Sequence, residues 1–320
     1  MGTLYIDRKD IELRHDSGCL LIYEQGERSS SVPYSHLERI VVFNRAVLDT
    51  SVLGALAEHG ISLVTLNARY PERTAQMLAH THNEAARRIA QYQLSLDETW
   101  RSRWSRILVK RKILAQRVLL MQAMEARPDA RHALFNAIAQ LNDRLLSLAT
   151  NSGRDSLRGI EGAAASAYFS GYCALFAPEL DFTGRNRRPP KDPVNACLSL
   201  AYTLAHSDAV VACHAAGLDP LLGFYHDLSF ARESLACDLL EPLRAHIDHW
   251  VWQQFRNRTL RADHFSQDKG ACLLGKAGRK IFYTQWEMFA GRSRRRLRAY
   301  TRLMLRALNR ENHDVANRNA

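Results

Sequence analysis

The pattern of apolar and polar residues changes once along the chain, at about residue 80. Before this point, short apolar or alternating runs are separated by turn residues, a pattern typical of β-strands. A single helix is predicted over residues 49–59, because the glycine at position 60 can end it in the left-handed conformation. The runs that we expect to form strands are residues 3–6, 11–14, 19–23, 39–43 and 61–66.

After residue 80, apolar residues recur with the i, i+3, i+4 spacing of amphipathic helices. Two segments interrupt this pattern. One is a basic, proline-rich loop over residues 184–193, and the other is a predicted hairpin that pairs residues 272–274 with residues 280–283. The predicted helices cover residues 85–96, 98–124, 130–149, 160–176, 193–216, 228–257 and 292–309.

These two patterns predict an α+β protein with two domains. A small β-rich domain over residues 1–79 is followed by a large all-α domain over residues 80–320, and a chain of 320 residues can bury a core in each. No uncharged run reaches the ~18 residues that span a bilayer, and the first residues do not form a signal peptide. We therefore expect no membrane contact. The six cysteines form no C-x-x-C pair and are expected to be reduced, so we expect a cytoplasmic protein.

Four acidic or imidazole residues are candidates for a divalent-metal site: Glu161, His226, Asp238 and Glu241. Asp238 and Glu241 are three residues apart in a helical stretch, so their side chains share one face. Glu161 lies among small apolar residues, where a buried carboxylate needs a compensating cation or proton. Oxygen ligands with one imidazole suit Mg²⁺ or Mn²⁺. The spacing alone also fits a structural arrangement, in which Asp238 pairs with an arginine, Glu241 faces solvent and His226 is a satisfied polar residue.

The charge of the chain points to nucleic acid. There are 44 Lys and Arg against 33 Asp and Glu, a formal net charge of +11, and arginine forks match phosphate oxygens. The proline-rich loop is either a phosphate clamp or a solvated linker. The last predicted helix has no acidic residue from position 290 to 310, which favours a polyanionic partner. The DNA-binding candidates in these two segments are Arg185, Arg187, Arg188, Lys191, Arg294, Arg295 and Arg298.

Four motifs, in this order, make the chain resemble a known family. They are Gly-Ile-Glu-Gly-Ala-Ala-Ala-Ser-Ala-Tyr-Phe over residues 159–169, Arg-Arg-Pro-Pro-Lys-Asp-Pro-Val-Asn over 187–195, Gly-Phe-Tyr-His over 223–226, and Cys-Asp-Leu-Leu-Glu-Pro-Leu-Arg over 237–244. Together with the β-rich start, they resemble the CRISPR-associated spacer integrases, the core subunit of the CRISPR adaptation machinery. The resemblance covers nearly the whole chain.

The resemblance implies roles for the candidate metal site. Glu161, His226 and Glu241 match the family's ligands to a divalent ion, which is Mg²⁺ or Mn²⁺. Asp238 matches a nearby acidic position that supports the site. All four are therefore expected to be catalytic, three of them as metal ligands.

Other positions match the family less closely. Tyr168 and Asn195 fall at motif positions for which we expect helix-packing or near-site roles. Tyr225 and Asp227 flank the histidine where many members have leucine and glutamate. The departure leaves the histidine in place and affects only what surrounds it.

The resemblance also implies an activity and partners. The expected reaction is the metal-dependent joining of prespacer 3′-hydroxyl ends to the repeat of a CRISPR array. Family members form homodimers through their N-terminal domains and assemble with a small ferredoxin-like partner subunit. Two alternatives stay open: a metal-dependent nuclease acting on branched DNA in repair, and a basic DNA-binding scaffold with an inactive site. A nuclease would give hydrolysed DNA ends, whereas an integrase would give joined products. A scaffold with an inactive site would show no dependence on Mn²⁺ or Mg²⁺.

Overall fold

The computed structural model describes residues 2–66, 74–78, 82, 84–150, 153–186, 189–230 and 232–318. The chain divides into two compact units, residues 1–83 and 84–320. The division lies a few residues after the predicted one. The N-terminal unit is rich in strands and the C-terminal unit is mostly helical, so the predicted α+β class is confirmed.

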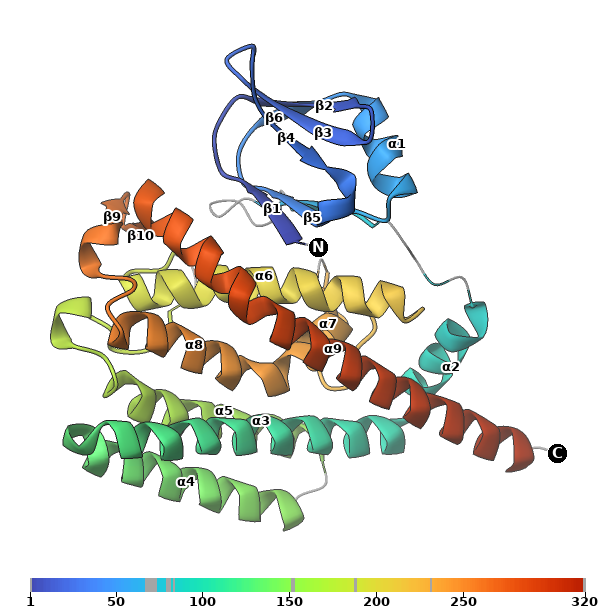
Figure 1. Ribbon diagram of the computed structural model, residues 1–320. Helices are drawn as coiled ribbons and strands as arrows, with labels where there is room; N and C mark the ends of the chain where they lie inside the picture. The colour runs from blue at the N-terminus through green and yellow to red at the C-terminus, as the bar shows by residue number, and fades with distance from the viewer. Residues whose placement is uncertain are drawn as a thin grey trace. The chain divides into compact units, whose positions relative to one another are not determined.

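Two four-stranded sheets form the described part of the N-terminal unit, with one helix beside them (Figure 1). The first sheet has the order β1-β5-β7-β8, in which only β8 is antiparallel to its neighbour. The second has the order β4-β3-β2-β6. The strands are β1 (Gly2–Ile6), β2 (Ile11–Asp16), β3 (Cys19–Glu24), β4 (Glu27–Pro33), β5 (Leu37–Val42), β6 (Ala46–Leu48), β7 (Ser62–Thr65) and β8 (Ala75–Met77).

Helix α1 (Thr50–Glu58) completes the core of this unit. Asp49 caps its first turn, since its carboxylate accepts the N–H of Ser51 at 2.8 Å. Gly60, with a φ of 70°, follows its end, as the sequence predicts. The core is closed by residues from both sheets and from α1, among them Leu13, Leu20, Ile40, Val52 and Leu56.

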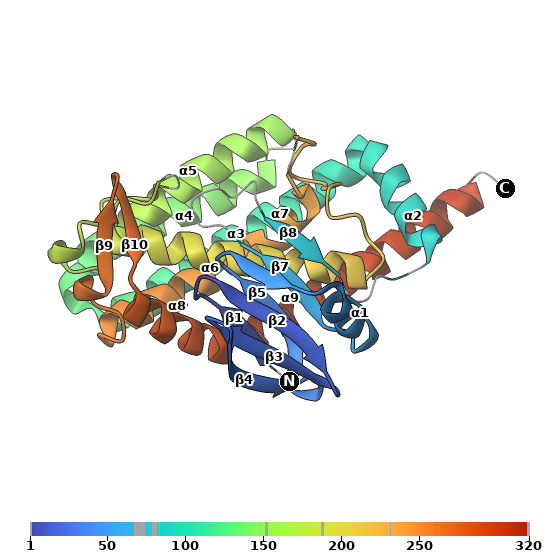
Figure 2. The same cartoon turned by 90° about the horizontal axis from the view of Figure 1, so that it is seen from above.

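The C-terminal unit is built on long helices, and α9 runs diagonally across it (Figure 1). A short hairpin, β9 (Phe265–Asp268) and β10 (Ala271–Leu274), lies at one end of this unit (Figure 2). The helices are α2 (Ala85–Leu96), α3 (Glu98–Ala126), α4 (Arg131–Thr150), α5 (Arg154–Cys173), α6 (Pro193–Ala215), α7 (Ser234–Leu240), α8 (Arg244–Arg256) and α9 (Lys276–Arg318). Short 3₁₀ turns are η1 (Tyr34–His36), η3 (Pro128–Ala130), η4 (Pro178–Leu180), η5 (Glu241–Leu243) and η6 (Ala262–His264).

Helices α3, α4 and α5 pack side by side. Gly171 on α5 permits this approach: a Cβ there would lie 2.7 Å from the Cβ of Ala137 on α4 and 3.3 Å from Leu120 on α3. The first distance is shorter than real Cβ contacts, so the glycine is needed for the packing. The contact fixes α3 and α5 relative to each other, and both carry residues of the candidate site.

Helix α6 is the most apolar of the long helices. It is the one helix among the described residues long and apolar enough to cross a membrane by length and composition. Its most apolar window is 56% buried inside the protein, and core helices pass the same test. Its apolar character is therefore accounted for by packing against α7, α8 and α9.

The predicted hairpin is wrong in its second strand. Strand β10 pairs with β9, which precedes it, and not with residues 280–283. Lys269 and Gly270 form the turn with φ of 50° and 79°, the left-handed values that suit a two-residue hairpin. This Lys-Gly turn was not predicted from the sequence.

Residues 280–283 belong instead to α9, which begins 16 residues before the predicted start at position 292. Gly278 suggests a turn in the sequence. A Cβ on this residue would lie 2.9 Å from the carbonyl oxygen of His264, so the glycine lets the first turn of α9 pass close to that backbone.

The predicted helix over residues 228–257 is interrupted. Helix α7 begins only at Ser234, and η5 separates it from α8. Pro242 explains the break, because it has no N–H to continue the α-helical ladder and favours a tighter turn. Asp238 and Glu241 therefore do not share one continuous helical face, and their carboxylates bind different partners.

Candidate active site

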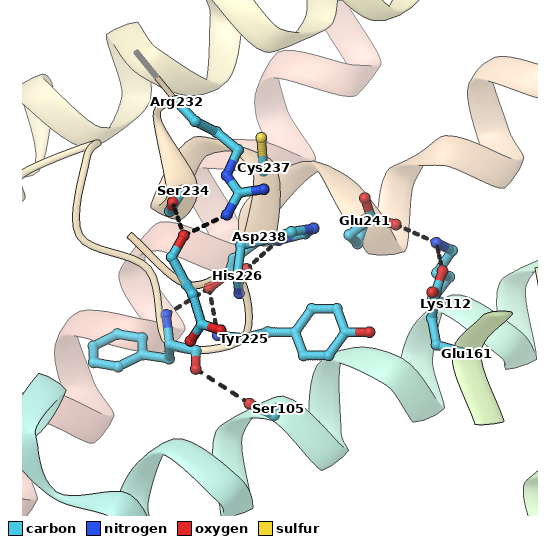
Figure 3. A network of polar contacts seen from close by, with 12 residues as sticks. Ser105, Lys112, Glu161, Tyr225, His226, Arg232, Ser234, Cys237, Asp238 and Glu241 are labelled. Atoms are coloured by element: carbon cyan, nitrogen blue, oxygen red, sulfur yellow. Dashed lines mark hydrogen bonds and ion pairs between the residues drawn. The ribbon is translucent and has the colours of Figure 1, made fainter. Parts of the chain in front are cut away.

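The four predicted residues lie on elements that meet around α3. Glu161 is on α5, His226 is in the loop before α7, Asp238 is on α7 and Glu241 begins η5. Both α5 and η5 pack against α3. Figure 3 shows Asp238 beside His226, and Glu241 facing Lys112, which also contacts Glu161.

Asp238 is fully buried and organises the loop that carries His226. Its Oδ2 accepts the backbone N–H groups of Phe224 and Tyr225 at 2.7 and 2.9 Å, and its Oδ1 accepts that of His226 at 3.0 Å. Oδ1 also lies 2.7 Å from Nδ1 of the His226 ring. Because a carboxylate only accepts, Nδ1 carries a proton, and in the neutral ring Nε2 keeps its lone pair. Asp238 thus orients an imidazole that can bind a metal through Nε2.

Gly223 lets this loop close over Asp238. A Cβ at this position would lie 2.8 Å from the backbone carbon of Ser234 and 2.9 Å from Oδ2 of Asp238. Neither atom can move aside cheaply, since one is backbone and the other belongs to a carboxylate held by three N–H groups. The glycine of the Gly-Phe-Tyr-His motif is therefore required by the geometry of the loop.

A lysine bridges the two glutamates. Lys112 on α3 makes an ion pair with Oε1 of Glu161 and lies 2.5 Å from Oε2 of Glu241. Nε of Arg244 donates to the other oxygen of Glu241 at 2.7 Å. The side chains of Lys112, Glu161 and Glu241 are 12%, 22% and 7% exposed. Two cations and two carboxylates thus form a cluster that is largely withdrawn from water.

The cluster keeps Glu241 and Lys112 charged. Burial opposes ionisation of Glu241, but Arg244 and Lys112 outweigh it and hold its pKa well below the usual range. Burial likewise opposes the charge of Lys112, and Glu241 and Glu161 outweigh it, so the pKa of Lys112 is raised. Burial, together with the charges of Glu161 and Glu241, raises the pKa of Tyr225, which keeps this phenol neutral. At neutral pH the site therefore presents a carboxylate at Glu241 beside a neutral phenol.

These residues fit a hard divalent cation in chemical kind, with two carboxylates and one imidazole nitrogen. Oε2 of Glu241 is buried and lies 2.5 Å from the ammonium of Lys112. A positively charged His226 would lower the pKa of Glu241, so the ring lies within electrostatic range of that carboxylate. Among the described residues, no three His, Cys, Asp or Glu side chains are close enough to hold one ion. The structure thus brings Glu161 and Glu241 together around Lys112, with His226 nearby.

Asp227, next to His226, is held by three arginines. Arg101 on α3 donates to its carboxylate at 2.9 Å, and Arg154 and Arg158 on α5 both form ion pairs with it. Burial opposes ionisation of Asp227, yet the guanidinium groups hold its pKa below the usual range. These contacts fasten the loop of His226 to two helices of the site.

Comparison with known proteins shows the family. The family model described as CRISPR associated protein Cas1 matches residues 4–288. The chain belongs to the Cas1 family. The CRISPR-associated endonuclease Cas1 1 of Thermodesulfovibrio yellowstonii is 40% identical over 297 residues, which are 92% of this chain and 93% of that protein. The resemblance stated from the motifs is confirmed.

Solved structures share the Cas1 fold at lower identity. A casposase bound to an integration product is 20% identical, with a TM-score of 0.76 over 89% of this chain and 82% of that one. A chain of a Cas6-RT-Cas1–Cas2 complex is 21% identical, with a TM-score of 0.81 over 97% of this chain and 35% of the longer chain.

Tyr168 and Asn195, the expected supporting residues, are fully buried. The Asn195 amide donates to the carbonyl of Gly184 at 2.8 Å and to Asp192 at 2.6 Å, which fastens the proline-rich loop to α6. The Tyr168 hydroxyl donates to Asp248 at 2.7 Å.

Asp248 connects Tyr168 to the glutamate cluster. Tyr202 also donates to Asp248, and the guanidinium of Arg244 lies 4.6 Å from the centre of the Tyr202 ring. Arg244 in turn binds Glu241. Tyr168 is therefore connected to the glutamate cluster through this chain of contacts and forms part of the packing behind Arg244.

The predicted DNA-binding residues have different environments. Arg187 and Arg188 lie outside the described residues. Arg185 donates to Asn195 at 2.8 Å and to Ser199 at 3.0 Å, so its guanidinium is engaged within the protein. Lys191 is exposed. The geometry argues against Arg185 as a phosphate contact and leaves Lys191 as a candidate.

The arginines of α9 also differ in whether they are paired within the protein or exposed. Arg294 is 11% exposed and pairs with Asp208 at 3.2 Å and with Glu287 at 2.5 Å. Its expected role in DNA binding is therefore not supported, because its charge is balanced within the helical unit. Arg295 and Arg298 are exposed, as a surface that binds a polyanion requires.

The roles of Lys112, Arg244 and the arginines around Asp227 were not predicted from the sequence. In the sequence Lys112 belongs to one basic stretch with its neighbours, although Val109 and Ile113 on either side of it are buried. Arg244 follows Glu241 by three residues, the spacing of an ion pair on a helix, and could have been found.

Proposed function

We propose that this Cas1 protein is a metal-dependent integrase of CRISPR adaptation. It joins the 3′-hydroxyl ends of a prespacer to a phosphodiester at the edge of a repeat. The observation that carries the proposal is the pairing of the partly exposed Glu161 with the buried Glu241 around Lys112. The imidazole of His226 is held nearby through Nδ1, and Nε2 of the neutral ring can bind metal. The casposase of similar fold, which was solved with an integration product, supports it.

Glu161, Glu241 and Nε2 of His226 would hold Mg²⁺ or Mn²⁺, which lowers the pKa of an attacking hydroxyl and offsets charge on phosphorus. Asp238 keeps the proton of His226 on Nδ1. Arg244 keeps Glu241 ionised. These residues prepare the site before substrate binds, which lowers the cost of reorganisation during the reaction.

DNA is proposed to lie on exposed basic side chains, which contact phosphates and carry little sequence information. Lys191, Arg295 and Arg298 are the described candidates, and Arg187 and Arg188 stay predictions. We propose a homodimer formed through the N-terminal units, and a small ferredoxin-like Cas2 partner. The similarity to a chain of a Cas1–Cas2 complex supports the latter.

The test is an integration assay with labelled prespacer and repeat DNA, with and without the Cas2 partner. Glu161→Ala should abolish joined products while DNA binding survives. Glu125→Ala, on an exposed position of α3, is the control and should keep both. Loss of binding with joining retained would contradict the assignment.

The same assay separates the two other functions. Hydrolysed ends without joined products would indicate a nuclease that acts on branched DNA, with water in place of the 3′-hydroxyl. DNA binding that ignores both chelators and Glu241→Ala, with no product of either kind, would indicate a scaffold with an inactive site.

A further inference from the structure

Lys112 occupies the place between the two carboxylates that we propose as metal ligands. Its ammonium contacts Oε1 of Glu161 and Oε2 of Glu241, at 2.5 Å from the second. The lysine projects from the packed face of α3, where Val109 and Ile113 are 2% and 0% exposed. The stem therefore has a fixed origin, and only its flexible end can move.

The carboxylates need this cation in the absence of another one. Two largely buried carboxylates repel each other, and each loses solvation on burial. Arg244 compensates one oxygen of Glu241. In the described part of the chain, Lys112 is the one ion-pair partner of Glu161. Lys112 thus lets both charges persist side by side.

A divalent ion would bind the same two oxygens. Mg²⁺ lies at about 2.0–2.1 Å from its oxygen ligands. An ammonium that touches both oxygens fills the space in which such an ion would sit, and two cations at that separation repel each other. Lys112 and the divalent ion therefore exclude each other at this position.

We propose that Lys112 is the counter-cation of the metal-free site, and that a divalent ion takes its place between Glu161 and Glu241. The lysine stays charged and its end swings aside when the ion enters. This rests on the proposed function, because it takes the two glutamates as metal ligands. Lys112 then has two effects: it stabilises the metal-free protein, and it weakens the apparent affinity of the site for metal.

A permanent structural bridge makes the opposite prediction. If Lys112 only held the glutamates in place, its removal would disorganise the ligands and weaken metal binding. If it competes with metal, its removal strengthens binding. The sign of the change in Mn²⁺ affinity decides between the two.

The experiment titrates the metal-free, full-length protein with Mn²⁺ and follows the free ion by electron paramagnetic resonance. Lys112→Met should lower the dissociation constant about tenfold, the scale of removing one charge–charge repulsion in a partly buried site. Lys110→Met, at an exposed position on the same helix, is the matched control and should bind as the wild type does. Equal or weaker binding by Lys112→Met overturns the proposal.

Thermal unfolding without metal gives a second measurement. Lys112→Met should unfold at a lower temperature than the wild type, and saturating Mn²⁺ should restore most of the loss. Adding Glu161→Gln to Lys112→Met removes one of the repelling charges and should also restore stability. If neither Mn²⁺ nor Glu161→Gln restores the stability of Lys112→Met, the proposal fails.

The outcomes also separate this inference from the proposed function. If the wild type binds Mn²⁺ and Lys112→Met binds it no more tightly, only the role of Lys112 is overturned. No Mn²⁺ binding by any of these proteins overturns the metal site and, with it, the role of Lys112.

Discussion

Asp238 and His226 share a 2.7 Å hydrogen bond that determines which nitrogen of the imidazole can accept a ligand. The Asp238→Asn variant places an amide where four groups approach as donors. The NH₂ group of the asparagine is itself a donor and cannot accept these bonds. At least one buried N–H therefore loses its acceptor, and the tautomer of His226 is no longer fixed. We expect metal affinity to fall by roughly 10- to 100-fold, as for other losses of a carboxylate behind a histidine ligand. Mn²⁺ titration measures this.

Asp143→Asn provides the control, since Asp143 is an exposed aspartate on α4. It should leave Mn²⁺ binding and integration unchanged. If Asp238→Asn bound Mn²⁺ with unchanged affinity, the contact between Asp238 and His226 would not contribute to metal binding.

Gly223→Ala should distort the loop that carries His226. The added Cβ would lie 2.8 Å from the backbone of Ser234. Overpacking of this kind costs about 1–3 kcal/mol, and here it also displaces the imidazole. Integration should fall further than the loss of stability explains, measured on protein that is still folded by circular dichroism.

The matched substitution is Gly291→Ala on α9, where a Cβ meets nothing within 4 Å. It should raise stability by up to about 1 kcal/mol, because alanine favours the helix interior. If both alanine variants kept full activity, the close approach at Gly223 would not matter for the site.

The spacing of apolar residues was enough to predict the two-part fold, because the first part has the short runs of strands and the second has the i, i+3, i+4 spacing of helices. It failed where a single residue overrides the pattern. Pro242 breaks a helix whose apolar spacing continues, and Gly278 suggests a turn although it packs inside α9. Strand β4 was missed because it is mostly exposed and its residues are polar.

The candidate site shows the same division. Its glutamates and histidine could be named because motifs surround them. Lys112 could not, because it precedes Glu161 by 49 residues, and the two side chains meet only once α3 and α5 pack. The separate tasks of Asp238 and Glu241 also depend on the 3₁₀ turn between α7 and α8, which spacing alone does not reveal.

Asp248 should make stability depend on pH. Burial raises the pKa of this carboxyl to about 6, although hydrogen bonds from Tyr202 and Tyr168 oppose the shift. The unfolded chain releases the proton near its ordinary pKa of about 3.9. Between these values the native state holds a proton that the unfolded state has released, so this contribution is fully present below about pH 4 and is lost as pH rises through about 6. The difference of about two units corresponds to about 3 kcal/mol.

Urea unfolding of the wild type and Asp248→Asn from pH 4 to 8 measures this contribution. The asparagine cannot ionise, so the stability of the variant relative to the wild type should increase as pH rises, and level off above about pH 6 to 7. A difference that is constant over this range would mean that Asp248 titrates alike in both states.

Helix α9 allows DNA binding and folding to be separated within a few residues. Arg295 and Arg298 are exposed, whereas Arg294 compensates Asp208, whose side chain is 2% exposed. Arg295→Ala with Arg298→Ala should weaken DNA binding at an unchanged unfolding temperature. The slope of log affinity against log salt should fall by about 0.9 for each phosphate that the variant no longer neutralises.

Arg294→Ala should behave in the opposite way. Its removal leaves the carboxylate of Asp208 buried without this partner, and breaking such a pair costs about 3–5 kcal/mol at most, less where other contacts persist. The unfolding temperature should therefore fall, while the salt dependence of DNA binding by the folded fraction stays that of the wild type. If Arg294→Ala instead reduced the salt slope without loss of stability, the arginine would be a phosphate contact, and the division of α9 into an inward and a DNA-facing set would be wrong.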